Sequence, residues 1–563
     1  MVVQPTLFAV SRLEGGARWD QDVDVVRVLG SSQIGAEHVV SSALSSAATL
    51  LPIGNRLMRA GLVNAMCTGL VAWLVFEIAR RLFARQSARV ESLALAAAAA
   101  LLATNNGLWQ LEGARLGGAA VSTVLVLASL FLQTSRALGI VRHSLAQGVV
   151  LGLLAVESRP VALMCLLVLA LRPAALGELP RLASLVLGTI AGVVTVALGL
   201  LPSLLALVLH SGRGLRGLAV ELPLATRSLG AWAPLEELGL YIALLGIAGA
   251  AMGLVRPRWR VIVLPVLSLP VVHAFWGRTE TATIAVVAVA LLSCLGAQVV
   301  LKMLRTSRLP LWRGSTRVLG LLHLSALLMV AEGAREAHER RQVNATSTWS
   351  EHALHRLPAS SLVLTNTPDA AWRLWAESLA TGVRPDVLHV PQALLAHGDL
   401  VRDLLKEEPA LAPLIRDMAL DGRAGEFALS QVADTRPLRV EPDSAWDKRM
   451  LSHCVPDGLW FRFAPHELGR SDRKRAQHSA MHATLAVART AASSLGRDEW
   501  TLGRLRHDLI QQAAVAVALH DRQNARALIR RLKRVGEADA AVLKLERQLA
   551  EPTSVATVGD LLR

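Results

Sequence analysis

The chain has 563 residues, of which 53% are apolar and 18% are charged, and its mean hydropathy is +0.42. These values argue against a purely soluble protein. The formal charge of +15 would indicate a polyanionic partner such as nucleic acid in a soluble chain. However, residues 1–332 carry 27 basic and 15 acidic side chains, whereas residues 333–563 carry 32 and 29. The excess belongs to the apolar part, so we expect no nucleic-acid partner.

Apolar stretches bounded by arginine-rich turns recur along residues 57–332. Because a bilayer core requires a helix of about 17–25 apolar residues, we interpret these stretches as about ten membrane spans. The run 1–10 is apolar but too short to span; either a first span is missing from the start, which we favour, or the chain begins outside the membrane without one. The predicted spans are 57–79, 91–104, 117–133, 143–156, 160–171, 182–209, 237–254, 261–275, 281–301 and 316–332.

The distribution of cations predicts how these spans are oriented. Lys and Arg are retained on the cytoplasmic side of short loops. Alternate connections between the spans hold sixteen cations, whereas the intervening connections hold six. The asymmetry places residues 1–56, the loop 210–236 and everything after 332 on the extracytoplasmic side, in a bacterial cytoplasmic membrane.

Three aspartates alternate in the first outer segment, where residues 18–24 read Arg-Trp-Asp-Gln-Asp-Val-Asp. A carboxylate held near both water and a buried substrate is suited to act as a general base or to bind a cation. Asp20 and Asp22 are therefore candidate catalytic residues. The alternative is a solvated loop in which an acidic residue starts a helix.

Other ionisable residues lie at the edges of the predicted spans. For Glu157 and Arg159, which flank a turn before a proline, the alternative to a substrate contact is a local ion pair. Glu112 and Arg115 are three residues apart and have the same two interpretations. The remaining residues of this kind are Glu77, which we expect to reach the membrane interface beside Arg80 and Arg81, and His273 and Glu280.

Two separated segments carry a resemblance to a known family. Residues 50–56 (Leu-Leu-Pro-Ile-Gly-Asn-Arg) resemble the first helical hairpin of the domain-of-unknown-function 2723 family, relatives of a protein O-mannosyltransferase. Residues 357–366, followed by Trp375 and residues 382–387, resemble the opening of that family's extracytoplasmic domain. The resemblance implies a polytopic membrane bundle with a C-type glycosyltransferase fold.

The resemblance also implies a lipid-phosphate sugar donor, an acceptor outside the membrane and an acidic residue in the first outer loop. The family's Asp-Ser-(Gly/Ala)-Glu and His-Pro-Pro-Gly segments are not intact here, although Asp20 or Asp22 can take the acidic place. The chemistry needs a carboxylate base and cations that hold the leaving phosphate. The predicted substrate-binding residues are Asp24, His38, Glu112, Arg115 and Arg159, with Arg213, Arg216 and Arg227 as further cations.

The polar part is predicted to contain two domains. Within residues 333–476, apolar runs at 361–365 and 386–390 enclose a helical pattern at 370–380, which is the spacing of a βαβ unit. Residues 366–369 follow the first strand, where α/β domains place ligand contacts, or form a turn in which Asp369 caps the next helix. Residues 477–563 are predicted to form a tetratricopeptide-like tail with helices at 477–495, 503–519, 523–534 and 537–549.

The four cysteines offer no disulfide pair and no metal-ligand spacing. We expect no cofactor, since the lipid-linked sugar is a substrate, and no metal site, and we leave open whether a divalent cation takes part. The first functional hypothesis is a membrane glycosyltransferase that moves a sugar from a polyprenyl-phosphate donor to an extracytoplasmic acceptor. The second is an inactive membrane scaffold whose outer domain and helical tail bind a protein partner. A transporter is less favoured, because the spans show no paired interrupted segments.

Overall fold

The chain folds into two compact units, which are described separately. The bundle unit comprises residues 1–15, 34–210 and 219–338, and the sheet unit comprises residues 16–33, 211–218 and 339–563. The computed structural model describes residues 3–10, 13, 22–30, 38–83, 89–134, 140–170, 182–195, 232–255, 257–306, 320, 343–493, 499–535, 540–550 and 558–559.

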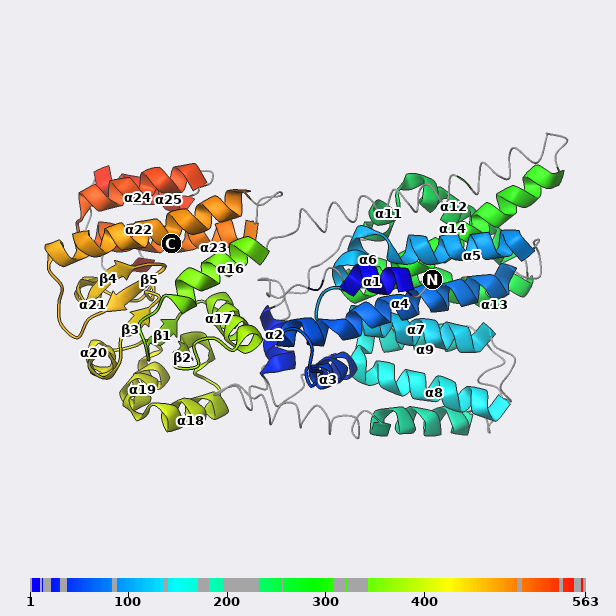
Figure 1. Cartoon of the computed structure of the whole chain (residues 1–563), viewed down its shortest axis with the longest axis horizontal. Helices are drawn as coiled ribbons and strands as arrows, with labels where there is room; N and C mark the ends of the chain where they lie inside the picture. The colour runs from blue at the N-terminus through cyan, green and yellow to red at the C-terminus, as the bar shows by residue number, and fades with distance from the viewer. Residues whose placement is uncertain are drawn as a thin grey trace. The chain divides into compact units, whose positions relative to one another are not determined.

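The bundle unit is helical, and helices lie within nine of the predicted spans, of which 182–209 is described only to residue 195 (Figure 1). The predicted span 316–332 lies outside the described residues except for Gly320. By length and composition, the two helices at Arg56–Phe83 and Glu280–Met303 are able to cross a membrane. The helices are α1 Val3–Val10, α3 Val39–Ala48, α4 Arg56–Phe83, α5 Arg89–Thr104, α6 Gly107–Glu112, α7 Ala119–Thr134, α8 Ile140–Glu157, α9 Arg159–Ala170, Leu182–Thr195, α11 Ala233–Leu238, α12 Leu240–Val255, α13 Pro257–Trp276 and α14 Thr279–Thr306.

Helix α14 forms the centre of the bundle and packs against α5, α7, α12 and α13. It is apolar around its whole circumference, as expected of a helix that has neighbours on every side. Glycines allow its close approach to α12, because a Cβ at Gly249 would lie 2.0 Å from the carbonyl oxygen of Leu292. At the same crossing, the Ser293 hydroxyl donates a hydrogen bond of 2.6 Å to the carbonyl of Ile242. Small residues and interhelical hydrogen bonds are the features that hold apolar helices together in lipid.

A second close crossing joins α8 to the helix Leu182–Thr195. Gly148 and Gly152 lie on α8, and Gly188 and Gly192 lie on its neighbour, each pair spaced four residues apart. A Cβ at Gly148 or Gly188 would lie within 2.2 Å of a backbone oxygen of the facing helix. The two glycine pairs therefore allow backbone-to-backbone contact, the arrangement that GxxxG motifs provide in membrane helices.

The sheet unit is built on five strands in the order β2-β1-β3-β5-β4. The predicted βαβ unit is confirmed: β1 is Leu362–Thr365, α17 is Pro368–Thr381 and β2 is Leu388–Pro391, and the two strands are parallel. Strand β3 (Leu438–Val440) pairs with β1 in parallel. Strands β5 (Trp460–Phe463) and β4 (Cys454–Asp457) complete the sheet with antiparallel pairing.

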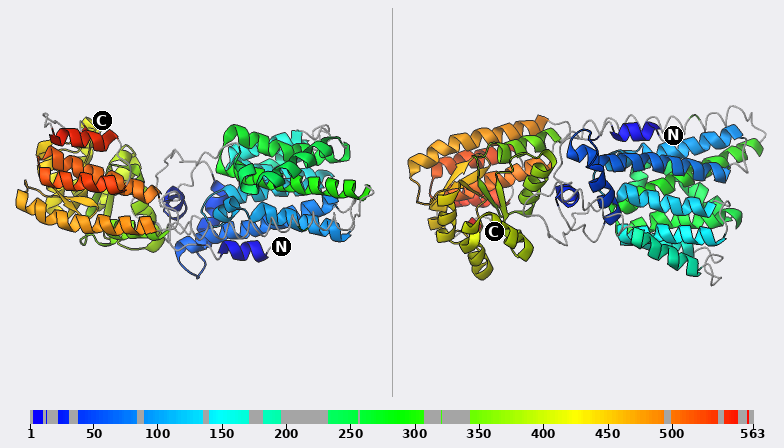
Figure 2. Two further views of the ribbon diagram at one scale, coloured as in Figure 1. Left: turned by 90° about the horizontal axis from the view of Figure 1, so that it is seen from above. Right: turned by 60° about the horizontal axis from the view of Figure 1, so that its bottom comes forward.

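Helices cover both faces of this sheet, as Figures 1 and 2 show. The four predicted tail helices are present as helices α22 to α25, which lie on one side, whereas α18 to α20 lie on the other. Helix α2, from the N-terminal segment, also belongs to this unit and packs against α17. The helices are α2 Asp22–Leu29, α16 Val343–Ser350, α18 Gly398–Glu407, α19 Ala412–Asp421, α20 Glu426–Thr435, α21 Lys448–Ser452, α22 Arg470–Ser493, α23 Glu499–Ala518, α24 Arg522–Val535 and α25 Ala540–Ala550.

His389 lies on β2, the strand at one edge of the sheet. Its side chain is buried, and among the described residues neither ring nitrogen has a hydrogen-bond partner. Burial lowers the pKa of His389 to about 4. The folded sheet unit therefore holds this imidazole in its neutral form at neutral pH.

Filling the α12–α14 crossing should destabilise the bundle. We expect Gly249→Leu to lower the free energy of unfolding by about 1–3 kcal/mol or more, because the new side chain has only backbone to displace. Thermal unfolding of the full chain in detergent measures the change. Ala251→Leu, on the exposed side of the same helix, is the control and should leave the unfolding temperature nearly unchanged. Equal effects of the two substitutions would contradict this packing.

His389 should make stability dependent on pH. The unfolded chain protonates this imidazole near its ordinary pKa of 6.5, but the folded chain does so only near pH 4. Protons therefore bind the unfolded state preferentially between these values, so stability is full above about pH 6.5 and falls by up to about 3 kcal/mol towards pH 4. Unfolding of wild type and His389→Leu across this range should diverge as pH falls, whereas the exposed His466→Asn should follow wild type. Parallel curves for His389→Leu and wild type would refute the assignment.

Candidate functional site

A buried group of ionisable side chains lies at one end of the bundle unit. Glu157 is the last residue of α8, Glu280 lies in the first turn of α14, and His38 is the N-cap residue of α3. The sequence prediction places all three of these helix ends on the extracytoplasmic side. They are among the residues noted from the sequence, but only His38 was predicted to bind substrate.

His38 lies between the two carboxylates. Its Nε2 is 2.8 Å from Oε1 of Glu280, and its Nδ1 is 3.6 Å from Oε1 of Glu157. Glu280 also accepts a hydrogen bond of 2.7 Å from the Ser158 hydroxyl, and Glu157 accepts one of 3.0 Å from the backbone N–H of Ser41. All five side chains are buried. We call His38, Glu157 and Glu280 the His38 cluster.

The backbone holds His38 in an uncommon conformation. Its φ is 61° and its ψ is 36°, in the left-handed region that costs energy for a residue with a side chain. A hydrogen bond of 2.7 Å from its N–H to the carbonyl of Glu157 fixes this geometry. Burial opposes the charge on His38, but Glu280 and Glu157 raise the pKa of the imidazole well above its ordinary value. The cluster therefore favours an imidazolium between two carboxylates.

The segment between α6 and α7 lies directly against the His38 cluster. A Cβ at Gly118 would be 1.8 Å from Nδ1 of His38, so only glycine fits there. Asn64, on α4, donates hydrogen bonds to the carbonyls of Arg115 and Gly117 and so holds the segment in place. The ion pair between Glu112 and Arg115 is present, with 3.5 Å between Arg115 Nη1 and Glu112 Oε1. Of the two predicted binding residues, Arg115 lies in the segment that contacts His38, and Glu112 is the last residue of α6, directly before it.

Arg159 is not part of the His38 cluster. It begins α9, and its side chain is exposed. The local ion pair that we considered for Glu157 and Arg159 does not form, because Glu157 turns inward to His38 and Ser41. The further predicted cations Arg213, Arg216 and Arg227 lie outside the described residues.

The aspartates of the first outer segment have different surroundings. Asp20 lies outside the described residues, whereas Asp22 and Asp24 lie in α2 of the sheet unit. Asp22 is buried and accepts a hydrogen bond of 2.8 Å from Nη1 of Arg373 on α17, so it is not in a solvated loop. Asp24 pairs with Arg27 at 3.3 Å. Asp22 is therefore engaged in an internal ion pair.

Arg373 organises a second buried ionic group. Besides Asp22, its guanidinium donates hydrogen bonds of 2.5 Å to Glu377 and 3.0 Å to the Ser350 hydroxyl. The Arg373 side chain is 1% exposed. Removing one partner of such a buried group costs several kcal/mol, about 3–5 in measured cases, because an uncompensated charge remains.

The carboxyl edge of β1, where a ligand was considered, is filled by the protein itself. Glu441, which follows β3, accepts hydrogen bonds of 2.8 Å from the backbone N–H groups of Asn366 and Thr367. Arg504 of α23 donates a hydrogen bond of 2.7 Å to Glu441 and another hydrogen bond to the Thr367 hydroxyl. The helix α17 has no side-chain cap, so the capping role considered for Asp369 is wrong. Although burial opposes its ionisation, Arg504 and these donors hold the pKa of Glu441 well below its usual range.

Within the described ranges, no group of three or more His, Cys, Asp or Glu side chains is arranged to hold a metal ion. The four cysteines, all in described segments, are buried and are not joined in disulfides. The imidazole and the two carboxylates of the His38 cluster are groups that accept and donate protons and form hydrogen bonds. The sequence did contain a signal for this site. Glu157 and Glu280 both lie at ends of predicted spans, and both ends are on the predicted extracytoplasmic side.

Comparisons with known proteins give weak likenesses. No family model and no curated protein matches the sequence. ArnT from Cupriavidus metallidurans bound to undecaprenyl phosphate is similar with a TM-score of 0.46 and 13% identity, over 72% of this chain and 87% of that chain. The oligosaccharyltransferase of Archaeoglobus fulgidus in its apo form is similar with a TM-score of 0.41 and 11% identity, over 80% of this chain and 69% of that chain. Similarity at this level assigns neither a fold family nor a function.

Proposed function

We propose that this protein is a membrane glycosyltransferase of the C-type, which moves a sugar from a polyprenyl-phosphate donor to a protein or glycan outside the bacterial cytoplasmic membrane. The observation that carries the proposal is the buried His38 cluster at the predicted outer end of an apolar helical bundle. Ionisable groups buried in such a bundle are costly and mark functional sites more often than not. The resemblance of residues 50–56 and 357–366 to a family of sugar transferases supports the same conclusion.

The reaction requires two kinds of group. A base takes the proton of the acceptor hydroxyl as that oxygen attacks the sugar's anomeric carbon, and a cation stabilises the departing lipid phosphate. Glu280 is our choice for the base, because His38 contacts one of its carboxylate oxygens and Ser158 donates a hydrogen bond to the other. Arg115, in the segment whose Gly118 contacts His38, is our choice for the phosphate contact.

Glu280 is preferred over Asp22 on the basis of their surroundings. The Asp22 carboxylate is 2% exposed and is held by the permanent charge of Arg373. A guanidinium stays protonated, so Arg373 is unable to relay a proton that Asp22 accepts. Glu280 contacts the imidazolium of His38, which, unlike a guanidinium, is able to release its proton. Asp20 keeps its predicted role as the alternative base in the first outer segment.

A second candidate function is a non-catalytic membrane scaffold. The specific observation in its favour is the sheet unit, where Glu441 and Arg504 fill the strand edge at which α/β domains bind ligands. In that case the outer domain and its helical tail bind a protein partner at the cell envelope.

Neutralising Glu280 should abolish sugar transfer. We expect Glu280→Gln to lower the transfer rate by about 10²–10⁴-fold, the range that general-base catalysis contributes, while the chain still folds. The measurement is glycan profiling of envelope proteins and polysaccharides in a deletion strain complemented with each variant. His38→Gln should have an effect of similar size, because the imidazole contacts both carboxylates.

The control is Glu77→Gln. It removes a carboxylate that pairs with Arg80 and Arg81 near the C-terminal end of α4, and this variant should complement the deletion fully. Thermal unfolding of each purified variant separates loss of chemistry from loss of fold. Complementation by folded Glu280→Gln, together with failure of Asp20→Asn, would move the base to the first outer segment. Unchanged glycans in the deletion strain itself would leave the scaffold as the function.

A further inference from the structure

A row of aligned residues crosses one face of the sheet. The strand registers place His389, Val363, Arg439, Arg462 and Val455 opposite one another on β2, β1, β3, β5 and β4. Side chains in register on neighbouring strands point to the same face. Two arginines are thus neighbours in the middle of this row.

The two arginines form an unfavourable pair. Arg439 and Arg462 are directly opposite on antiparallel strands, where like charges destabilise a sheet. Arg439 is buried, and Asp457 compensates its charge at 2.6 Å. Burial lowers the pKa of Arg439, Asp457 opposes that effect, and Arg462 adds to it. Among the described residues, no carboxylate forms an ion pair with Arg462, so one positive charge is left over.

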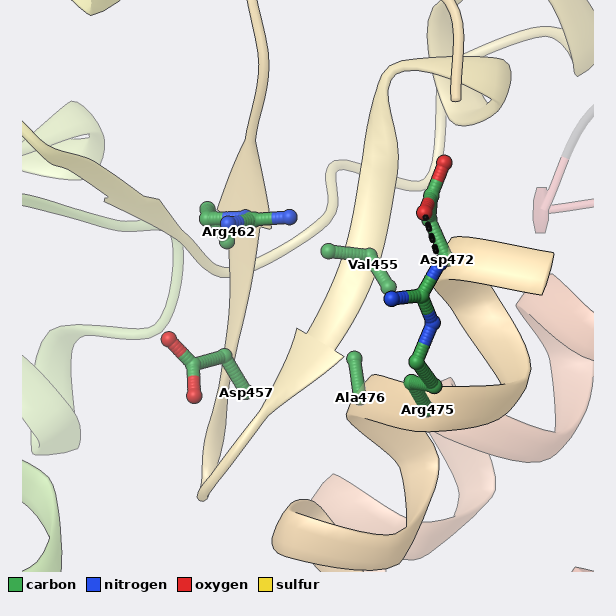
Figure 3. A pocket seen from close by; sticks show the side chains of 6 residues that line it. All are labelled: Val455, Asp457, Arg462, Asp472, Arg475 and Ala476. Atoms are coloured by element: carbon green, nitrogen blue, oxygen red, sulfur yellow. Dashed lines mark hydrogen bonds and ion pairs between the residues drawn. The ribbon is translucent and has the colours of Figure 1, made fainter. Parts of the chain in front are cut away.

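The excess charge borders a cavity. The cavity has a volume of about 330 Å³ and lies between the β4–β5 edge and α22. Figure 3 shows the guanidinium groups of Arg462 and Arg475 on either side of Val455. Arg475 pairs with Asp472 at 3.3 Å. The lining residues are Val455, Asp457, Arg462, Asp472, Arg475 and Ala476.

We propose that this cavity binds an oxyanion, a phosphate or a carboxylate, carried by a ligand of about the size of one sugar residue. The planar guanidinium of Arg462 matches two oxygens of such a group, and Arg475 approaches from the other side. Val455 and Ala476 provide an apolar floor for the carbon face of the ligand. A bound oxyanion offsets the repulsion between Arg439 and Arg462. The site is separate from the His38 cluster and does not depend on the proposed transferase activity.

The size of the cavity limits the ligand. Pockets that enclose small molecules begin at about 300 Å³, so this one admits a single small group and not an extended chain. Asp457 and Asp472 line the same cavity and would repel a ligand with many negative charges. The same carboxylates are able to accept hydrogen bonds from sugar hydroxyls, which favours a singly anionic sugar or a sugar phosphate.

Titration of the full chain in neutral detergent at constant chloride tests the proposal. The probes are inorganic phosphate, glucuronate and, as the uncharged counterpart, glucose. We expect saturable heats with at least one oxyanion and none with glucose. Phosphate binding that is weaker in micelles doped with phosphatidylglycerol than in those doped with phosphatidylcholine would identify the source as a lipid headgroup, and equal binding would identify a soluble ligand.

Matched substitutions decide whether the binding occurs in this cavity. Arg462→Gln should weaken oxyanion affinity by about tenfold or more, which is the usual effect of losing one charge-assisted hydrogen bond, and Arg475→Gln should act similarly. Arg402→Gln, on α18 at the opposite face of the sheet, is the control and should bind as wild type does. Equal affinity of wild type and folded Arg462→Gln, or no binding of any oxyanion to wild type, would overturn the proposal.

Discussion

The free energy needed to bury a charge governs this structure more than any other single factor. A charge removed from water must find an opposite charge or several hydrogen bonds, because an unpaired one costs many kcal/mol. Three buried ionic groups meet this requirement: His38 with Glu157 and Glu280, Asp22 with Arg373, and Glu441 with Arg504. Each of them joins segments that are far apart in the chain. These contacts attach α3 to α8 and α14, α2 to α17, and α23 to the end of β3.

Local patterns in the sequence predicted part of the secondary structure, but not strands β3, β4 and β5 or helices α2 and α18 to α21. Apolar runs between arginine-rich turns predicted helices that the bundle contains, and β-branched runs on either side of a helical segment predicted β1, α17 and β2. These features depend on neighbouring residues, so their periodicity is visible in one chain. The pair of Glu112 and Arg115 was found for the same reason, since three residues of spacing suffices to bring them together.

The ionic groups could not be predicted in this way. Glu157 was considered as a partner of Arg159, two positions away, but it contacts His38, which is 119 residues earlier in the numbering of the same chain. Glu441 follows a short strand with nothing in its sequence neighbourhood to indicate that Arg504 will reach it. Spacing along the chain carries no information about such contacts, because the packing of whole helices decides which ends meet. The candidate site therefore emerged from the fold, and only His38, Glu112 and Arg115 could be selected beforehand.

The bond between Asp22 and Arg373 links residues 351 positions apart within a single unit. The sheet unit is thus discontinuous in the chain: it begins with α2, and the rest of it is made only after the bundle segments have been synthesised. Contacts of such long sequence separation form slowly, and chains fold from the N-terminus as they are made. The valine side chains and Asp22 of α2 therefore remain without their partners on α17 until α17 has been synthesised. A fragment that starts after the bundle would therefore lack a piece of its own core.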